Sequence, residues 1–237
     1  MRHDNRKPDE ARPLRFTTGY VEYPAGSVLV ETGKTRVLCN ATVELRVPPY
    51  LMGTGKGWVT AEYSMLPAAT KERTRRDVQN LKLSPRSAEI QRLVGRALRS
   101  VTDLTMLDGM TITIDCDVLQ ADGGTRTASI TGGWLALWLA CESLRKEGKL
   151  AKNPVRSEVA AISAGVIDGE VLLDLDYSED SRAQADFNMV MTADGDIIEL
   201  QGTGEERPFT RSELDQMLTM GQKAIAEMCR VRRGYMC

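Results

Sequence analysis

The sequence predicts a mixed α/β fold made of two halves, in each of which strand-like runs precede a helix. Three observations carry this prediction. Short β-rich runs bounded by Gly and Pro fill the chain up to residue 66, and an apolar pattern of helical period follows. A strand, a glycine-rich loop and an apolar helix then succeed one another. Beyond Pro154, two hairpin patterns lead into a last helical period.

Length and composition fit an ordinary globular protein. The chain has 237 residues, of which 42% are hydrophobic and 27% charged, which excludes a disordered, collagen-like or coiled-coil chain. That length fits one large domain or two small ones, and we expect a single domain over residues 1–237. No apolar run approaches the roughly 18 residues of a membrane span, so no membrane partner is expected.

The start of the chain and its cysteines predict a cytoplasmic protein. The polar N-terminus lacks the apolar stretch of a secretory signal. Five widely spaced cysteines indicate free thiols in a reducing compartment. The absence of a Cys-x-x-Cys motif, with His3 as the sole histidine, argues against a zinc site and against a His-activated nucleophile.

The first segment is predicted to be rich in strands. Residues 1–15, rich in Arg and Pro, are interpreted as an arm that a partner could hold in place. Strands are then expected at residues 20–23, 27–31, 35–47 and 57–66. Pro48 and Pro67 end the last two of these runs.

The next element is a helix that begins at Pro85. Ser84 is suited to cap it, and proline is favoured at the first helical position. One apolar stripe recurs at helical spacing and consists of Ile90, Leu93, Val94, Ala97, Leu98 and Val101. Arg86 falls in the first turn, where the helix dipole disfavours a cation. Either an anion binds beside Arg86, or its side chain faces solvent at a small cost.

A strand over residues 111–118 leads through a glycine-rich loop into an apolar helix that ends near Lys146. This arrangement presents backbone N–H groups and the positive helix end to a phosphate. Arg126 adds a forked donor and Thr125 a hydroxyl. The alternative is that Gly123 and Gly124 serve only the geometry of the turn.

The second half is predicted to form two hairpins and a helix. Strands at residues 159–167 and 171–176 are joined by Asp168-Gly169, and strands at 184–192 and 196–201 by a turn with Asp194-Gly195. A helix over residues 212–230 closes the chain, and its methionines are interpreted as core residues.

Charge is distributed unevenly, although the formal net charge is only −2. Residues 71–99 contain nine basic and three acidic residues, a net +6. Residues 168–196 contain nine acidic residues and one Arg, a net −8. A local basic segment rich in Arg suggests a polyanion partner. The alternative is that solvated basic helices meet acidic loops across a subunit contact.

The acidic segment allows three interpretations. Asp174 and Asp176 are expected on one face of a strand, with Asp180 in the following loop and Asp186 at the start of the next strand. Two carboxylates brought together there could hold Mg²⁺ or serve as a general acid/base pair. They could equally belong to a solvated acidic loop.

Eight short motifs are distributed along the chain, and the longest of them ends in Gly-Gly-Thr-Arg-Thr. They lie at residues 1–6, 61–67, 89–96, 115–127, 175–177, 179–180, 185–190 and 201–205. Through these motifs the chain resembles the ribonuclease PH family of phosphate-dependent exoribonucleases over nearly its whole length. The resemblance implies an α/β fold of two βαβ-type halves with mixed sheets and flanking helices. It also implies a homo-hexameric ring, a trimer of dimers.

The resemblance further implies an activity and its residues. The family shortens RNA, mainly precursor tRNA, from the 3′ end with inorganic phosphate and releases nucleoside diphosphates, and the reaction is reversible. The family's phosphate-binding positions correspond to Arg86, Gly124, Thr125 and Arg126. Its catalytic carboxylates correspond to Asp180 and Asp186, which work with Mg²⁺ or Mn²⁺. The RNA-binding residues implied are Lys71, Arg73, Arg75, Arg76 and Arg92.

Two alternatives belong to other functional classes. One is a non-catalytic ring subunit that only binds RNA; such subunits tend to lose the phosphate-binding arginines or the aspartates, whereas this chain keeps Arg86, Arg126, Asp180 and Asp186. The other is a small-molecule phosphotransferase, but the glycine-rich loop lacks the Gly-Lys-Ser/Thr ending of a P-loop.

Overall fold

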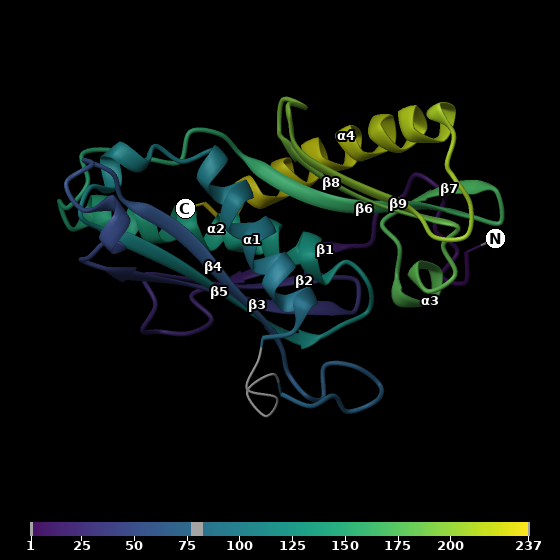
Figure 1. Ribbon diagram of the computed structural model, residues 1–237, viewed down its shortest axis with the longest axis horizontal. Helices are drawn as coiled ribbons and strands as arrows, with labels where there is room; N and C mark the ends of the chain where they lie inside the picture. The colour runs from purple at the N-terminus through teal and green to yellow at the C-terminus, as the bar shows by residue number, and fades with distance from the viewer. Residues whose placement is uncertain (1, 77–82, 237) are drawn as a thin grey trace.

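The computed structural model describes residues 2–76 and 83–236, and its two sheets alternate with helices in four layers (Figure 1). The first sheet has the order β1-β2-β3-β5-β4. Its strands are β1 (Leu14–Thr18), β2 (Gly26–Thr32), β3 (Thr35–Glu44), β4 (Trp58–Met65) and β5 (Thr111–Gln120). Among the described strands of this sheet, only β4 and β5 pair in parallel, and helix α1 (Pro85–Ser100) lies between them in the chain as a βαβ unit.

The second sheet has the order β7-β6-β8-β9, and all its described pairs are antiparallel. Its strands are β6 (Val159–Ile167), β7 (Glu170–Leu173), β8 (Ala185–Thr192) and β9 (Ile197–Gly204). Both predicted hairpins are present. Because each short turn reverses the direction of the chain, the strands that it joins pair antiparallel. This half therefore has strands followed by a helix, as predicted, but its described strands form no parallel pair.

Helix α2 (Thr125–Lys146) lies between the two sheets and packs on both, whereas α4 (Arg211–Arg233) covers the outer face of the second sheet (Figure 1). Because α2 is enclosed from both sides, it is apolar around most of its circumference. The largest core cluster therefore joins both halves: Val159, Ala161 and Val190 of the second sheet belong to the same cluster as β2, β3 and α2. The predicted α/β fold is confirmed.

The helix predictions agree closely with the structure. Ser84 caps α1, its hydroxyl accepting the N–H of Ser87, and every residue of the predicted apolar stripe is buried. Helix α2 ends at Lys146, as expected. The described part of the chain also contains no helix long and apolar enough to span a membrane.

Two local predictions were wrong. Residues 20–23 form an exposed bend, in which Tyr23 is 94% exposed, and the strand lies earlier at Leu14–Thr18. Phe16 explains the shift, because it pairs with Val30 and is buried beneath Tyr235. The strand predicted at 171–176 ends at Leu173, so Asp174 and Asp176 do not share a strand face.

Candidate active site

The glycine-rich loop packs tightly between β5 and α2. Gly123 and Gly124 have φ values of 75° and 68°, in the left-handed region that favours glycine. A Cβ on Gly123 would lie 2.6 Å from the carbonyl oxygen of Leu175. The glycines thus serve the turn geometry and also allow the loop to touch the segment that leads to Asp180.

The N-terminus of α2 is available to an anion. No side chain among the described residues caps it, and its first-turn N–H groups have no acceptor within the helix. These N–H groups and the positive end of the helix dipole favour a bound phosphate. Gly124 and Thr125, two of the predicted phosphate-binding residues, lie at this position.

Thr125 and Arg126 are held by residues from other elements. The Thr125 hydroxyl is buried and lies 2.8 Å from the Tyr63 hydroxyl on β4. Burial raises the pKa of Tyr63, whereas its bond to Thr125 and the charge of Arg86 act in the opposite direction. Arg126 donates to the Gln201 side chain on β9 at 3.0 Å and lies 3.6 Å from Glu89 on α1.

Arg86 is exposed at the second position of α1, where the helix dipole disfavours a cation. Its charge reaches two groups from other parts of the chain: it acts against the raised pKa of Tyr63 and against that of Asp180. Arg86 therefore faces the same region as Arg126 and the N-terminus of α2, which favours the interpretation in which an anion binds beside it.

The two predicted catalytic aspartates also come together here. Asp180 ends the short helix α3 (Tyr177–Asp180), and Asp186 is the second residue of β8. Desolvation raises the pKa of Asp180, whereas Arg86, Arg126 and Arg12 lower it. Desolvation also raises the pKa of Asp186; the negative charge of Asp180 adds to this, and Arg126 opposes it. The aspartates thus repel one another, and the negative charge of Glu205 also raises the pKa of both.

This pair of carboxylates fits a divalent cation. A bound cation would relieve both the desolvation and the mutual repulsion that raise the two pKa values. Carboxylate oxygens are the donors that Mg²⁺ takes, and it commonly uses one or two of them together with waters and substrate phosphates.

A second group of possible metal ligands is already occupied by protein contacts. His3, Asp176 and Glu179 lie close to one another. Asp176 caps α3 by accepting the N–H groups of Ser178 and Glu179, and Glu179 accepts two hydrogen bonds of 2.7 Å from Arg2. We interpret this cluster as a structural ion-pair network.

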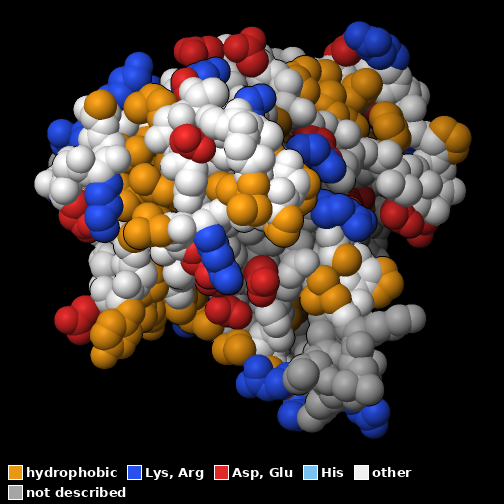
Figure 2. All heavy atoms as spheres, turned by 60° about the vertical axis from the view of Figure 1, so that its left-hand side comes forward, with side chains coloured by type: hydrophobic (Ala, Val, Ile, Leu, Met, Phe, Trp, Pro, Cys, Tyr) orange, Lys and Arg blue, Asp and Glu red, His pale blue; other side chains and the backbone are white. Residues whose placement is uncertain are grey.

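The predicted RNA-binding residues are all exposed. Lys71, Arg73, Arg75 and Arg76 are exposed in the irregular segment after β4, which extends below the first sheet in Figure 1. Figure 2 shows basic side chains gathered at the lower right, beside the part that is not described. Arg92 is exposed on α1. No contact recorded for residues 2–76 and 83–236 joins the segment from Lys71 to Arg76 to Asp180 or Arg126.

Two family models match the chain: the 3′ exoribonuclease family, domain 1, over residues 10–141, and domain 2, over residues 157–224. The chain belongs to the 3′ exoribonuclease family. The proposed phosphate residues fall in the first match, and both aspartates fall in the second.

Curated relatives of this exoribonuclease extend the similarity to nearly full length. The chain is 56% identical over 228 residues to "Ribonuclease PH" of Crocosphaera subtropica, covering 96% of this chain and 94% of that one. It is 56% identical over 230 residues to "Ribonuclease PH" of Bacillus subtilis, with the same coverage.

Solved structures share the fold of this exoribonuclease at low identity. A structure titled as an Archaeoglobus fulgidus exosome with RNA bound to the active site matches with a TM-score of 0.82 at 21% identity, covering 99% of this chain and 92% of that one. Rice (Oryza sativa) Rrp46 matches with a TM-score of 0.78 at 20% identity, and each chain is fully covered.

Several residues of the candidate site could not be predicted from the sequence. Tyr63, Gln201 and Asn188 lie within the family motifs, but no spacing rule links them to Arg126 or Asp186. Asn188 donates to Asp186 at 3.3 Å, two positions along the same face of β8. That alternation on a strand is the one local signal that could have indicated it.

Proposed function

We propose that this chain trims the 3′ end of RNA by phosphorolysis, with inorganic phosphate as co-substrate and precursor tRNA as the main substrate. One observation carries this function beyond family membership. Arg86 and Arg126, the latter in the uncapped first turn of α2, lower the pKa of Asp180, and Asp180 in turn raises the pKa of Asp186, so these charges share one region. Such a site suits a reaction that must bring two anions together, free phosphate and a phosphodiester.

The phosphate subsite consists of Arg86, Gly124, Thr125 and Arg126. The two guanidinium groups neutralise the phosphate, and the N–H groups at the start of α2 orient it. Tyr63 supports this arrangement, because its bond to the Thr125 hydroxyl fixes the first residue of the helix. Phosphate itself is the nucleophile, so the reaction needs no Ser, Cys or His.

The reaction exchanges one phosphorus–oxygen bond for another. A phosphate oxygen attacks the phosphorus of the last phosphodiester, and the bond from that phosphorus to the 3′ oxygen of the preceding nucleotide breaks. The last nucleotide leaves as a nucleoside diphosphate, and the 3′ oxygen of the shortened RNA takes up a proton. Because a phosphoanhydride forms, the step is readily reversible and 3′ nucleotide addition is possible.

Asp180 and Asp186 are the proposed catalytic residues. They would hold Mg²⁺ or Mn²⁺, which when bound stabilises charge on the phosphodiester and the leaving oxygen. Their raised pKa values also suit a carboxyl that holds a proton for the leaving 3′ oxygen. Most of the acceleration would come from positioning and electrostatics.

Binding of precursor tRNA requires more surface than the active site. Lys71, Arg73, Arg75, Arg76 and Arg92 are the proposed contacts to its backbone. Since this basic surface is small on one chain, a homo-hexamer built as a trimer of dimers would supply several copies to each tRNA. Within residues 2–76 and 83–236, four thiols are free and buried, which supports a reducing cytoplasm as the location.

The test is a short single-stranded RNA incubated with the protein and Mg²⁺, with and without inorganic phosphate. We expect nucleoside diphosphates only when phosphate is present. Release of monophosphates without phosphate would identify a hydrolase instead. RNA binding without any release would identify a subunit that binds RNA but does not cut it.

A further inference from the structure

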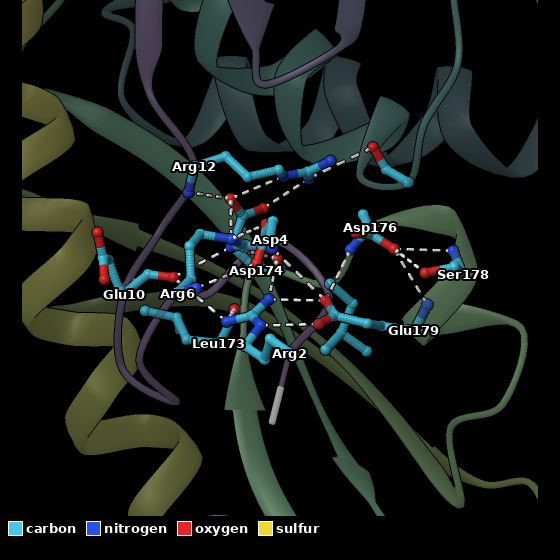
Figure 3. A network of polar contacts seen from close by, with 12 residues as sticks. Arg2, Asp4, Arg6, Glu10, Arg12, Leu173, Asp174, Asp176, Ser178 and Glu179 are labelled. Atoms are coloured by element: carbon cyan, nitrogen blue, oxygen red, sulfur yellow. Dashed lines mark hydrogen bonds and ion pairs between the residues drawn. The ribbon is translucent and has the colours of Figure 1, made fainter.

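Buried arginines hold the N-terminal arm against the acidic segment (Figure 3). Arg12 is 6% exposed, and its main-chain N–H donates to an Asp174 carboxylate oxygen at 2.7 Å. Its guanidinium donates twice more to the same carboxylate, Nε at 3.0 Å and Nη2 at 2.7 Å. Contacts within the chain therefore hold the arm in place without a partner.

The same guanidinium reaches the glycine-rich loop. Nη1 donates to the carbonyl oxygen of Asp122 at 2.5 Å, and Nη2 lies 3.5 Å from that of Gly123. A Cβ on Gly124 would lie 3.0 Å from Nη2, so the loop and the arginine are in close contact. One buried side chain thus binds both the phosphate loop and the segment that precedes Asp180.

These two segments must keep a fixed spacing for the reaction. The loop carries the donors for the attacking phosphate, and the segment after Asp174 carries Asp180. They touch directly where Gly123 meets the backbone of Leu175 and Asp176. The planar guanidinium satisfies acceptors on both at once, which a lysine ammonium on a flexible stem cannot reproduce.

Arg2 provides a natural comparison, because its described contacts lie only on the aspartate side and within the arm. It binds Glu179 through two hydrogen bonds and donates to the carbonyl oxygens of Leu173 and Asp174. No recorded contact among the described residues joins Arg2 to residues 121–127.

We propose that Arg12 is a positioning residue for phosphorolysis, which sets the phosphate loop at the correct distance from the Asp180 segment. This role rests on the proposed phosphate and aspartate sites. It differs from a purely structural role in a measurable way: loss of the bridge affects both phosphate binding and turnover, whereas loss of Arg2 affects turnover alone.

The test compares Arg12→Lys, Arg2→Lys and, as a control, Arg36→Lys, which alters an exposed arginine paired with Glu31. KM for inorganic phosphate and kcat are measured on a short single-stranded RNA. We expect Arg12→Lys to raise KM for phosphate about tenfold and to lower kcat about tenfold. Arg2→Lys lowers kcat but leaves KM for phosphate within twofold, and Arg36→Lys changes neither.

A second variant tests the same contact in case Arg12→Lys does not fold. Asp174 has a φ of 53°, which asparagine tolerates, so Asp174→Asn weakens the bond to Arg12 with little backbone cost. We expect it to raise KM for phosphate as Arg12→Lys does. If either variant is folded by circular dichroism and keeps wild-type KM and kcat, the positioning role is overturned. Equal rises in KM for phosphate in Arg2→Lys and Arg12→Lys also overturn it.

A binding measurement separates this proposal from the proposed function. Inorganic phosphate without RNA should raise the Tm of the wild type and of Arg2→Lys at similar concentrations, and that of Arg12→Lys only at about tenfold higher concentration. A wild type that releases no diphosphates would overturn the proposed function, while this shift would still support the link from Arg12 to the phosphate loop. Identical phosphate responses in all variants would overturn the link.

Discussion

Asp186 carries a charge that its surroundings oppose. Desolvation raises the pKa of its carboxyl, and the negative charge of Asp180 raises it further. Arg126 counteracts this for both aspartates, and Arg86 does so for Asp180. Two carboxylates that repel one another destabilise the folded state, so their presence here indicates a function that needs them.

The first residue-scale prediction concerns turnover. Asp180→Asn and Asp186→Asn should each lower phosphorolysis of a short RNA at least a hundredfold, because each removes a carboxylate that would hold the cation or the proton. RNA binding should remain within about threefold. Asp194→Asn, at an exposed turn of the same sheet, is the matched control and should keep wild-type turnover. Turnover above a tenth of wild type in both variants would contradict the assignment.

The second residue-scale prediction concerns stability and pH. The pKa of Asp186 lies above its ordinary value of 3.8, so the folded state favours the protonated form and ionisation above that raised pKa destabilises the fold. Asp186→Asn should therefore have a higher Tm than the wild type at pH 8 without divalent ions. The difference should shrink as the pH falls through the raised pKa toward 3.8, where the wild-type carboxyl becomes protonated.

Mg²⁺ provides the counterpart of this pH measurement. Added Mg²⁺ should raise the Tm of the wild type and should stabilise Asp186→Asn less, because the variant has lost one of the two carboxylates. If added Mg²⁺ leaves the Tm of the wild type unchanged at pH 8, the proposed cation site is wrong.

At the scale of elements, the contact between the glycine-rich loop and the Asp180 segment can be tested with two alanine variants. Gly123 and Gly169 have similar φ values, 75° and 79°, but a Cβ on Gly123 would collide with Leu175 and one on Gly169 meets open space. Both Gly→Ala changes should cost about 1–2 kcal/mol for the left-handed backbone. Only Gly123→Ala should also lower kcat, by tenfold or more. Equal activity in the two variants would show that the contact has no catalytic role.

The elements that the sequence predicts well carry their signals locally. The cap at Ser84, the proline at the start of α1 and the apolar stripe lie within one segment, and so do the Asp-Gly turns of the second sheet. The strand at Leu14–Thr18 depends on Phe16 reaching Tyr235 from the other end of the chain. No local pattern contains that contact, so the sequence predicts a strand at residues 20–23, which form a bend in the structure.

The same distinction applies to the site. Gly124, Thr125, Arg126, Asp180 and Asp186 could be proposed because they stand in recognisable motifs, and Arg86 because it is a cation in the first turn of a predicted helix. Arg12 could not, because its partners Asp122 and Asp174 lie more than a hundred residues away and a buried arginine looks like any other in a polar arm. The role of Tyr63 depends likewise on a contact between two distant elements, the bond from its hydroxyl on β4 to Thr125 at the start of α2.

At the scale of the whole molecule, helix α2 packs on both sheets, and we propose that the chain is a single cooperative domain. Its buried residues pack on both sheets, and Trp134 also lies 3.8 Å from the buried Arg232 guanidinium of α4. Unfolding in urea should therefore give coincident transitions by tryptophan fluorescence and by circular dichroism. Two separate transitions, or a stable fold of residues 157–224 alone, would contradict a single domain.

The exposed basic segment from Lys71 to Arg76 yields the last prediction. Replacing Arg73, Arg75 and Arg76 together with alanine removes three exposed cations of this segment. Binding of precursor tRNA should weaken at least tenfold at moderate salt, and the slope of log K against log salt should fall by about 2–3, one unit for each lost phosphate contact. Phosphorolysis of a short RNA should stay within twofold, because that substrate needs only the site around Asp186.

The control replaces three scattered exposed lysines, Lys34, Lys152 and Lys223, with alanine and makes the same change in net charge. If this control weakens tRNA binding equally, net charge rather than the basic segment attracts the RNA. If turnover of the short RNA falls as far as tRNA binding does, the segment reaches into the active site of the assembled protein.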